Sequence, residues 1–391
     1  MKYEKIRFGD LYAIDSRNGL SKPSKVRGSG YKMINMGELF ANDRIYDIPM
    51  ELVPLKDSEK VNAKVEVGDL LFARQSLVLE GAGKCSIVME VSPLTVFESH
   101  LIRVRLTDNV NPMFYYYYFH SPLSPMKSIV SQCAQAGIRG SDLQELSVLF
   151  PPKEIQDKIA NILEQYDSLI ENNQKQIKLL EEAAQRLYKE WFVDLRFPGY
   201  EETEIVDGVP AGWERKRLVD IVDVQYGYAF DSSMFNDVGN GMPIIRIRNI
   251  PYGNTTDFTT EEAEEKYVIS NGEILVGMDG EFHINSWSGD NAYLVQRTCC
   301  FRPRKNEMNG WILWAIYEPI KFYEKTVVGA TVSHLGKKHI DAIELLTGPD
   351  ELYIPFQILF EQRQNLLNQN NLLSEARDRL LPKLMSGEIE V

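Results

Sequence analysis

A long stretch of helical periodicity, from Pro152 to Phe192, is the feature that most constrains how this chain can fold. Its apolar residues recur mostly at steps of three, four or seven, which is the spacing of one stripe along an α-helix. They are Ile155, Ile159, Ile162, Tyr166, Ile170, Ile177, Leu180, Leu187 and Trp191. Such a helix would be about 60 Å long at 1.5 Å per residue. A compact core cannot easily enclose that length, so we expect a spine with a second element packed along its stripe.

The second element is a heptad of leucines near the C-terminus, at Leu352, Leu359, Leu366, Leu373 and Leu380. The two stretches also share letters, because LEEAAQRLY at 180–188 resembles LSEARDRLL at 373–381. We therefore predict that the two long helices pair as an antiparallel coiled coil. The amides Asn172, Asn173, Asn370 and Asn371 would then lie near the middle of the seam and set its register.

The rest of the chain also contains matching segments in the same order. KIRFGDL at 5–11 resembles RKRLVDI at 215–221, GDLLF at 68–72 resembles GEILV at 272–276, and LIRVR at 101–105 corresponds to CFRPR at 300–304. Together with the helical match, these pairs indicate a duplicated unit about 200 residues long. Each unit is a mixed segment followed by one long helix, which predicts a pseudo-twofold internal repeat.

The predicted fold class is α+β, with two globular mixed domains separated by the two helices. The predicted segments are a first globular domain at 1–150, a helical spacer at 151–197, a second globular domain at 198–350 and a C-terminal helical spacer at 351–391. Short apolar runs predict strands at 65–73, 86–89, 100–106, 244–250 and 293–301, and helices at 113–120 and 311–323. The aromatic residues of these two helices could stack on nucleobases, but packing against a sheet is the commoner use.

Composition limits the function classes. The net charge is −13, and residues 201–350 carry 24 acidic against 14 basic side chains, which argues against a general polyanion binder but not against a local basic face. No run of 18 apolar residues appears and the first residues lack a signal segment, so we expect a cytoplasmic location without a membrane partner. The four cysteines show no metal-binding spacing, and we expect them to be reduced and structural.

Motifs spread along the whole chain resemble the specificity subunit of type I restriction-modification systems. They are the central helical stretch PPKEIQDKIANILEQYDSLIENNQKQIKLLEEAAQRLYKEWF, the segment GMPIIRIRNI at 241–250, GDLL or GEIL in each half, and VGATVSHLGKKHI at 328–340. The counterpart of the last segment in the first half is QAGIRGSDLQEL at 135–146, which lacks the Thr-x-x-His pattern.

The resemblance implies a DNA-reading scaffold. Each globular domain would be a target recognition domain for one half of an asymmetric bipartite site in double-stranded DNA, with half-sites about one helical turn, roughly 34 Å, apart. Two methyltransferase subunits would dock on the helices and domains, and a translocating nuclease subunit could join them. The chain itself would bind no cofactor, whereas S-adenosylmethionine, ATP and Mg would belong to the partner subunits.

The missing motifs agree with a non-catalytic role. The sequence has no GxxxxGK[ST], GxGxxG, Asn-Pro-Pro-Tyr or HExxH. Asp257, Glu264 and Lys266 could be arranged into a nuclease-like set, but such spacing arises by chance in an acidic segment. The alternatives that remain are a two-armed coiled-coil scaffold for other ligands, and an enzyme whose site carries no recognisable motif.

The candidate DNA contacts of the first half lie in three places. Lys22, Lys25 and Arg27 are in the loop SKPSKVRGSG, which could approach a phosphate or be an ordinary solvated basic loop. Arg74 and Gln75 follow the GDLLFA strand and have the chemistry to read guanine or adenine edges. The resemblance adds Arg139, in the segment QAGIRGSDLQEL.

The candidates of the second half form two groups. Arg246, Arg248 and Asn249 alternate with isoleucines, so a strand there would have one cationic face, which could meet DNA or the acidic residues of its own domain. The resemblance carries over Thr331, Ser333, His334, Lys337 and Lys338 as candidate DNA contacts. His334 alone would more often be a structural histidine.

Four residues of the long helices are candidates for a partner-binding surface. Trp191 and Phe192 close the first helix, and Arg363 and Arg377 occupy positions of the second helix where an intramolecular seam would prefer apolar groups. Aromatic and arginine side chains are enriched at interface hot spots. The alternative is that all four cover the ends of their own coil.

Overall fold

A computed structural model describes residues 3–132, 136–327 and 333–391. Contacts divide the chain into two compact units: unit 1 is Met1–Ser168 with Glu375–Val391, and unit 2 is Leu169–Ser374. Each long helix is therefore shared between the two units, and the predicted boundaries at 150, 197 and 350 stay a prediction. Over the described ranges, no helix combines the length and apolar character that a bilayer span requires.

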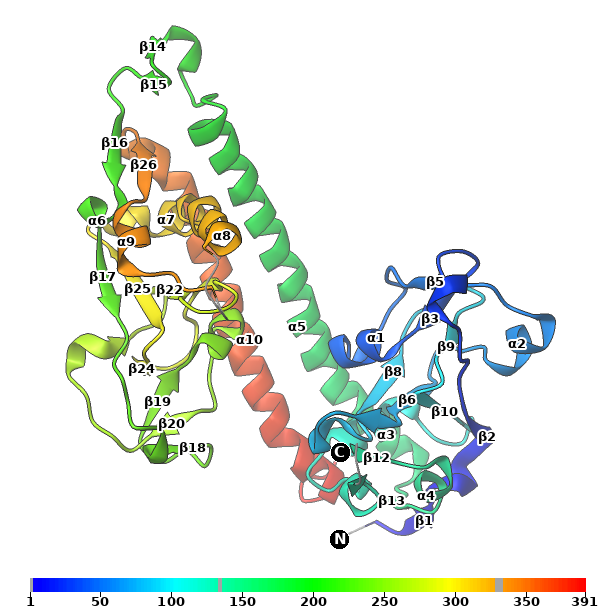
Figure 1. The fold of residues 1–391 in the computed structure, drawn as a ribbon. Helices are drawn as coiled ribbons and strands as arrows, with labels where there is room; N and C mark the ends of the chain where they lie inside the picture. Colours follow the sequence, from blue (N-terminus) through cyan, green and yellow to red (C-terminus); the bar gives the residue numbers. More distant parts are fainter. Residues whose placement is uncertain (1–2, 133–135, 328–332) are drawn as a thin grey trace. The chain divides into compact units, whose positions relative to one another are not determined.

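The two long helices are α5 (Lys153–Tyr188) and α10 (Ile354–Ser386). A π-helical turn, Lys189–Val193, continues α5, so the helix predicted from Pro152 to Phe192 is confirmed. Figure 1 shows α5 as one uninterrupted helix, and its 36 residues correspond to a length of about 54 Å.

The helices run antiparallel, as predicted. Within unit 2, Asn173 Nδ2 donates to Asn370 Oδ1 at 2.9 Å, and Glu181 Oε1 accepts a hydrogen bond from Arg363 Nε at 2.7 Å. Between these two contacts the residue number rises on α5, from 173 to 181, and falls on α10, from 370 to 363, so the helices are antiparallel. The predicted place of the amides in the seam is confirmed for Asn173 and Asn370. It is wrong for Asn172, which is exposed, and for Asn371, whose Nδ2 donates to Ser288 O of the globular domain at 2.8 Å.

The leucine heptad is not the most buried face of α10. Leu359, Leu366, Leu373 and Leu380 are half-buried, whereas Phe356, Phe360, Arg363 and Gln364 are buried. In unit 2 this second face packs against the globular domain. The helix is therefore covered by two neighbours, which a pattern of leucines alone does not indicate.

Unit 1 is built around a five-stranded sheet with the order β2-β10-β6-β8-β4 and a three-stranded sheet with the order β5-β3-β9. Its strands are β1 (Lys5–Arg7), β2 (Tyr12–Asn18), β3 (Tyr31–Ile34), β4 (Arg44–Ile45), β5 (Glu51–Val53), β6 (Leu70–Ala73), β7 (Gln75–Ser76), β8 (Cys85–Val88), β9 (Val96–Phe97), β10 (Leu101–Leu106), β11 (Ser131–Gln132), β12 (Ala136–Gly137) and β13 (Ser147–Leu149). Its short helices are α1 (Met36–Ala41), α2 (Asp57–Asn62), α3 (Pro112–His120) and α4 (Gly140–Gln144).

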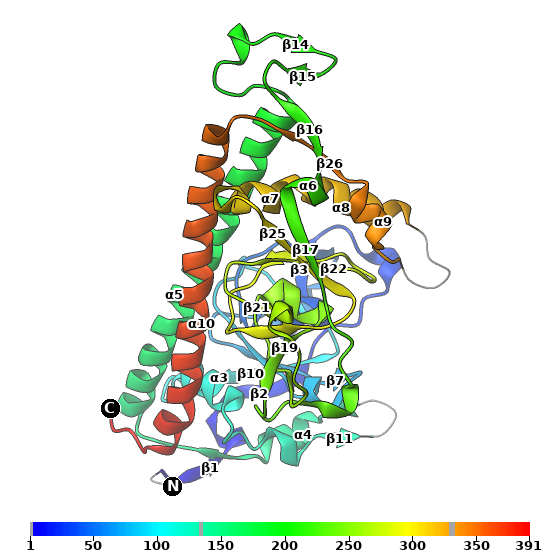
Figure 2. The same cartoon turned by 90° about the vertical axis from the view of Figure 1, so that its left-hand side faces the viewer.

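Unit 2 is built around a four-stranded sheet, β17-β25-β22-β23, and a five-stranded sheet, β18-β20-β19-β24-β21 (Figure 2). Its strands are β14 (Ile205–Val206), β15 (Val209–Pro210), β16 (Glu214–Arg217), β17 (Val222–Tyr226), β18 (Phe235–Asn236), β19 (Met242–Ile245), β20 (Phe258–Thr259), β21 (Val268–Ile269), β22 (Ile274–Gly277), β23 (Ile284–Ser286), β24 (Ala292–Leu294), β25 (Thr298–Pro303) and β26 (Glu344–Thr347). Its short helices are α6 (Leu218–Ile221), α7 (Asn309–Ala315), α8 (Tyr317–Thr326) and α9 (Lys337–Asp341).

The topology confirms the duplication. The strand order β2-β10-β6-β8 of unit 1 recurs as β17-β25-β22-β23 in unit 2, and the parallel pair β3·β9 recurs as β19·β24. A glycine makes the same close approach in both: a Cβ on Gly19 would lie 2.0 Å from the carbonyl oxygen of Phe97, and one on Gly227 would lie 2.0 Å from that of Val295. Both positions therefore require a residue without a side chain.

Several predicted elements are correct in type but wrong in extent. The strands expected at 86–89 and 100–106 correspond to β8 and β10, whereas the one expected at 65–73 is shorter, because only Leu70–Ala73 is extended after the turn at Gly68, φ 88°. The strand expected at 293–301 is divided into β24 and β25 at Arg297, φ 69°.

The expected helices are also present. The helix expected at 113–120 is α3, whereas the one expected at 311–323 is two helices, α7 and α8. Pro319 lies in the first turn of α8 and cannot donate the backbone hydrogen bond that a continuous helix would need.

The aromatic residues of these helices belong to the cores, as predicted. Phe114 to Tyr118 are buried in the core of unit 1, and Trp311 is fully buried in that of unit 2. Phe72 of β6 meets Phe119 of α3 edge-on with ring centroids 5.1 Å apart. These rings contribute apolar area and edge-to-face contacts to the cores and are not free to stack on bases.

Candidate nucleic-acid interface

In unit 1, the end of β6 meets two segments that are distant in sequence. The N–H of Arg74 donates to the carbonyl of His100 at 2.8 Å, and the N–H of Ile138 donates to the carbonyl of Arg74 at 3.0 Å. Gln75 then pairs with Gly137 across the ladder of β7 and β12. These bonds bring three predicted DNA contacts together, and we call the resulting group edge 1: Arg74, Gln75, His100 and Arg139.

Unit 2 repeats this backbone arrangement. The N–H of Met278 donates to the carbonyl of Arg297, and the N–H of Leu335 donates to the carbonyl of Met278, both at 2.8 Å. Asp279 forms an isolated bridge with His334. The equivalent group, edge 2, contains four predicted residues and two that the sequence reasoning missed: Asp279, Arg297, Ser333, His334, Lys337 and Lys338.

Edge 1 carries cationic and amide groups with few fixed partners. Arg139 is exposed and Arg74 is half-buried. Among the described residues, neither guanidinium has an ion-pair partner. His100 Nδ1 lies 3.3 Å from Glu98 Oε2. Arg74 and Arg139 carry the donors that suit a guanine edge, and the amide of Gln75 carries the donor and acceptor that suit an adenine edge.

Edge 2 is organised by a carboxylate. Asp279 Oδ1 lies 2.5 Å from His334 Nδ1, and Asp279 Oδ2 accepts a hydrogen bond from Arg297 Nη1 at 3.0 Å. Both side chains remain about half exposed, at 49% for His334 and 58% for Arg297. Arg297 adopts φ 69°, a left-handed conformation that costs about 1–3 kcal/mol in a non-glycine residue. The surrounding hydrogen bonds hold it there.

The two lysines of edge 2 begin helix α9. Both are exposed, and in the part of the chain that the structure describes neither forms an ion pair. Burial lowers the pKa of the neighbouring His339, and the charges of Lys338 and His334 lower it further. His339 Nδ1 accepts the N–H of Gly336 at 3.0 Å, so this imidazole is a structural cap, while the lysines form a small basic surface.

The predicted basic loop of the first half is largely paired within its own domain. Lys22 Nζ lies 2.7 Å from Glu59, and the Arg27 guanidinium lies 2.6 Å from Glu51. Lys25 is exposed and, within the described residues, has no ion-pair partner. Of the three predicted contacts, Lys25 is the one for which the described residues provide no carboxylate partner.

The predicted cationic strand face at Arg246, Arg248 and Asn249 is wrong. Strand β19 ends at Ile245 and a 3₁₀ helix, Ile247–Tyr252, follows it, so the alternation with isoleucine has no strand to act on. Asn249 Oδ1 accepts the N–H of Arg246 at 2.8 Å, which caps the short helix. Arg248 pairs with Asp257, as the alternative reading of this segment expected. Arg246 lies over the Phe235 ring at 5.8 Å.

The candidate partner-binding residues are mostly engaged within the chain. Phe192 is 6% exposed in the core of unit 2, and Trp191 packs beside it. Arg363 is 7% exposed and is bonded to Glu181, while Arg377 lies 2.6 Å from Asp167 in unit 1. These contacts favour the alternative that the residues cover their own coil.

The remaining expectations concern Thr331 and the cysteines. Thr331 and Cys133 lie outside the described residues. The other three cysteines are free and buried, and burial raises the pKa of the Cys299 thiol, which fits a structural role. Within the described ranges, no group of three or more His, Cys, Asp or Glu residues could hold a metal ion.

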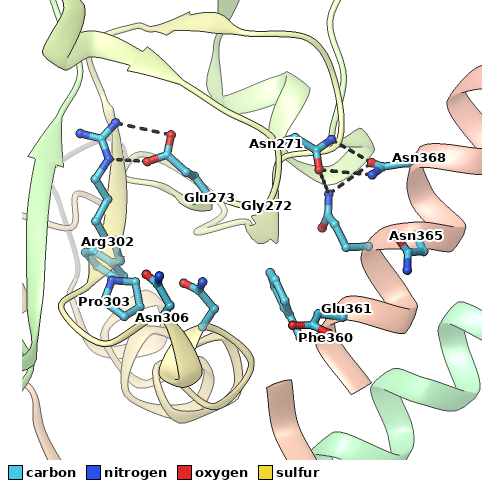
Figure 3. A pocket seen from close by; sticks show the side chains of 13 residues that line it. Asn271, Gly272, Glu273, Arg302, Pro303, Asn306, Phe360, Glu361, Asn365 and Asn368 are labelled. Atoms are coloured by element: carbon cyan, nitrogen blue, oxygen red, sulfur yellow. Dashed lines mark hydrogen bonds and ion pairs between the residues drawn. The ribbon is translucent and has the colours of Figure 1, made fainter. Parts of the chain in front are cut away.

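A polar pocket of about 560 Å³ lies in unit 2 between α10 and the loops of the globular domain. Figure 3 shows Asn271 facing Asn368 of α10 on one wall, and the ion pair of Arg302 with Glu273 on the opposite wall. The amides hold the domain against the helix, so the pocket is part of this internal contact.

The sequence reasoning missed His100, Asp279 and Arg297. No motif marks these residues, because their place depends on strand register. The duplication was the available signal: His100 and Arg297 occupy the same position in the two units, each accepting the backbone N–H of the residue that follows the GDLL or GEIL strand.

Comparison with known proteins identifies the same duplicated organisation. The family model described as the type I restriction modification DNA specificity domain matches residues 1–182 and 210–351. The MjaIX specificity subunit of Methanocaldococcus jannaschii is 28% identical over 324 residues, covering 78% of this chain and 75% of that protein. The EcoBI specificity subunit of Escherichia coli is 28% identical over 174 residues, covering 44% of this chain and 33% of that protein.

The fold likeness extends over the whole chain. The crystal structure of the type I restriction-modification system S subunit from M. genitalium superposes with a TM-score of 0.54 at 16% identity, covering 98% of this chain and 96% of that one. The two matched segments of the family model include both edges and most of both globular domains. The chain therefore belongs to the type I restriction modification DNA specificity domain family.

Proposed function

We propose that the chain is the DNA-binding specificity subunit of a type I restriction-modification complex and reads an asymmetric bipartite target, one globular domain per half-site. The observation that carries this proposal is the presence of two edges on the same backbone frame with different side chains. Gln75 of edge 1 stands where Asp279 stands in edge 2, and His100 stands where Arg297 stands. Equivalent frames with different chemistry fit two different half-sites.

The chemistry of each edge suits base edges in the major groove. Arg pairs with guanine O6 and N7, Gln pairs with adenine N6 and N7, and a carboxylate accepts from cytosine N4. The exposed lysines at the start of α9 suit phosphate contacts, which position the domain without reading sequence. The acidic character of residues 201–350 reduces non-specific attraction to DNA, so binding rests on these local groups.

The chain contributes specificity and its partners contribute chemistry. Two methyltransferase subunits would dock on the helices and recognition domains, and a translocating nuclease subunit would complete a restriction complex. S-adenosylmethionine, ATP and Mg would be bound by those partners. This division is supported by the family assignment and by the absence of nucleotide-binding and methyltransferase motifs in the sequence.

The test is a selection experiment with the chain assembled on its modification subunit. Duplexes with two randomised blocks would be bound, recovered and sequenced for the wild type and for the variants Arg74→Ala and His334→Ala. The expected result is one bipartite motif, with Arg74→Ala relaxing one block and His334→Ala relaxing the other, each by about 1–3 kcal/mol at the affected base pair.

Arg379→Ala is the matched control, because Arg379 is 77% exposed on α10 and its ion-pair partner among the described residues is Glu375 of the same helix. It should leave both blocks unchanged. Recovery of no motif by the wild-type complex would contradict the proposed function and favour a two-armed scaffold for other ligands. Equal relaxation of both blocks by one edge variant would contradict the assignment of one domain per half-site.

A further inference from the structure

A buried carboxylate joins three elements in unit 1. Asp167 of α5 is 6% exposed. Its Oδ1 accepts a hydrogen bond from Arg377 Nη1 of α10 at 2.6 Å, and its Oδ2 accepts one from the hydroxyl of Tyr117 at 2.7 Å. Tyr117 belongs to α3 and is 3% exposed. Asp167 therefore bonds both to the paired helix and to the globular domain, and we call this contact junction 1.

A buried guanidinium has the same role in unit 2. Arg363 of α10 is 7% exposed. Its Nε donates to Glu181 of α5, its Nη1 donates to Ser286 Oγ and its Nη2 donates to Asn285 Oδ1, each at 2.7 Å. Ser286 and Asn285 belong to β23 of the globular domain. Junction 2 thus also links α5, α10 and the domain that precedes α10 in the chain.

Amide contacts extend junction 2 along α10. Gln364 Oε1 accepts the hydroxyl of Ser286 at 2.7 Å, and its Nε2 donates to the carbonyl of Trp287 at 2.7 Å. Asn271 Nδ2 donates to Asn368 Oδ1 at 2.8 Å, and Figure 3 shows these two amides pointing at each other. Every bond in this set has a defined direction.

Directional bonds restrict the angle between a domain and its helices more than apolar contacts do. Apolar burial depends on area and tolerates small rotations. A buried charge that loses a partner is costly, because no water replaces the missing bond. Each junction holds a charge of this kind on the helix that follows the domain, so a rotation of the domain would break bonds to a buried ion.

We propose that Asp167 and Arg363 are positioning residues that set the orientation of each recognition domain on the helix pair, and so select the spacer length between the two half-sites. The inference rests on the proposed function. Neither residue is part of an edge, so neither reads bases. The spacer is therefore specified by residues inside the protein that never contact DNA.

The experiment uses conservative variants that remove one hydroxyl from each junction: Tyr117→Phe and Ser286→Ala. Each variant has a matched control in its own unit. Tyr115→Phe removes a buried hydroxyl of the same helix α3 that bonds Leu149 O at 3.1 Å inside the domain. Thr347→Val removes a hydroxyl that bonds Glu214 O at 2.9 Å. Neither control bond involves α5 or α10.

The assembled complex would be assayed on duplexes that carry the selected half-sites with spacers one base pair shorter, equal or one base pair longer. We expect the wild type and both controls to discriminate strongly against the altered spacers. Tyr117→Phe and Ser286→Ala should lower that discrimination by on the order of tenfold while binding to the selected spacer stays close to wild type. Thermal stability would be recorded for all five proteins.

The possible outcomes separate clearly. Unchanged discrimination in both junction variants would overturn the inference, and so would an equal loss in the controls, since that would indicate a general effect of stability. If only one of the two junction variants loses spacer discrimination, the inference is overturned for the junction whose variant is unchanged. If the wild-type complex binds no bipartite duplex, the proposed function fails, which is distinct from failure of the inference.

Discussion

Replacing Arg363 by methionine tests directly how much junction 2 contributes to the free energy of unfolding. The substitution keeps most of the side-chain volume but removes three charge-assisted hydrogen bonds, each 2.7 Å long. The partners are left unequally exposed. Ser286 keeps its bond to Gln364, and Glu181, whose side chain is 31% exposed, regains water. We therefore place the loss at the lower end of the range for breaking a buried ion pair, about 3 kcal/mol of the free energy of unfolding.

Tryptophan fluorescence is a selective assay for this loss. All five tryptophans, at positions 191, 213, 287, 311 and 314, lie in unit 2. Urea unfolding followed by tryptophan emission would therefore report the stability of the unit that contains Arg363. The expected result for Arg363→Met is a clear shift of the midpoint to lower urea concentration.

The control is Arg186→Met, since Arg186 is 83% exposed on α5 in the same unit and lies 3.8 Å from Glu182. Exposed pairs of this kind contribute at most about 0.5 kcal/mol. A change below about 1 kcal/mol for Arg363→Met, or an equal change for the control, would refute the reasoning that the junction is held by a buried charge.

Three further predictions use separate features. Replacing Lys337 and Lys338 together by alanine should lower the salt dependence of DNA binding by about 1–2 in the slope of log Kd against log salt; an unchanged slope in fluorescence anisotropy would exclude a phosphate role. Gly19→Ala should prevent unit 1 from folding, because the new Cβ would lie 2.0 Å from Phe97 O, whereas Gly37→Ala has open space; near-UV circular dichroism and soluble yield would show the difference, and two equally folded variants would disprove it. Burial raises the pKa of Tyr353 to about 12, above the roughly 10 of an unfolded tyrosine. The stability that comes from keeping the Tyr353 hydroxyl protonated is therefore complete below pH ~10 and is lost as the pH rises to 12. Urea midpoints that stay constant up to pH 11 would contradict this.

The long helices and the duplication could be predicted because both produce a periodic pattern in the sequence. A helix with one covered face shows a repeat near 3.6 residues, and a duplicated fold repeats its strand letters at a nearly constant offset. The covering of α10 on a second side was not predictable in this way. Arg363 breaks the apolar pattern, yet its partners Ser286 and Asn285 are more than 70 positions away in sequence.

The edges were predicted in part for a related reason. Arg74 and Gln75 follow a strand that the sequence indicates clearly, so their position at its end was predictable. Asp279 and Arg297 come together only through the register of β22 and β25 and the left-handed turn at Arg297. Arg246, Arg248 and Asn249 misled the prediction, because an alternating pattern of four residues fits a strand and also fits a strand end followed by a capped 3₁₀ turn.

The most direct test of the central claim is a map of methylated adenines. The chain would be combined with its modification subunit and S-adenosylmethionine, incubated with genomic DNA, and the modified positions would be read by sequencing. The account predicts one asymmetric motif, made of two short blocks at a fixed gap, that disappears when this chain is omitted. Methylation that is absent, or that is the same without the chain, would contradict the claim that the two domains direct the modification.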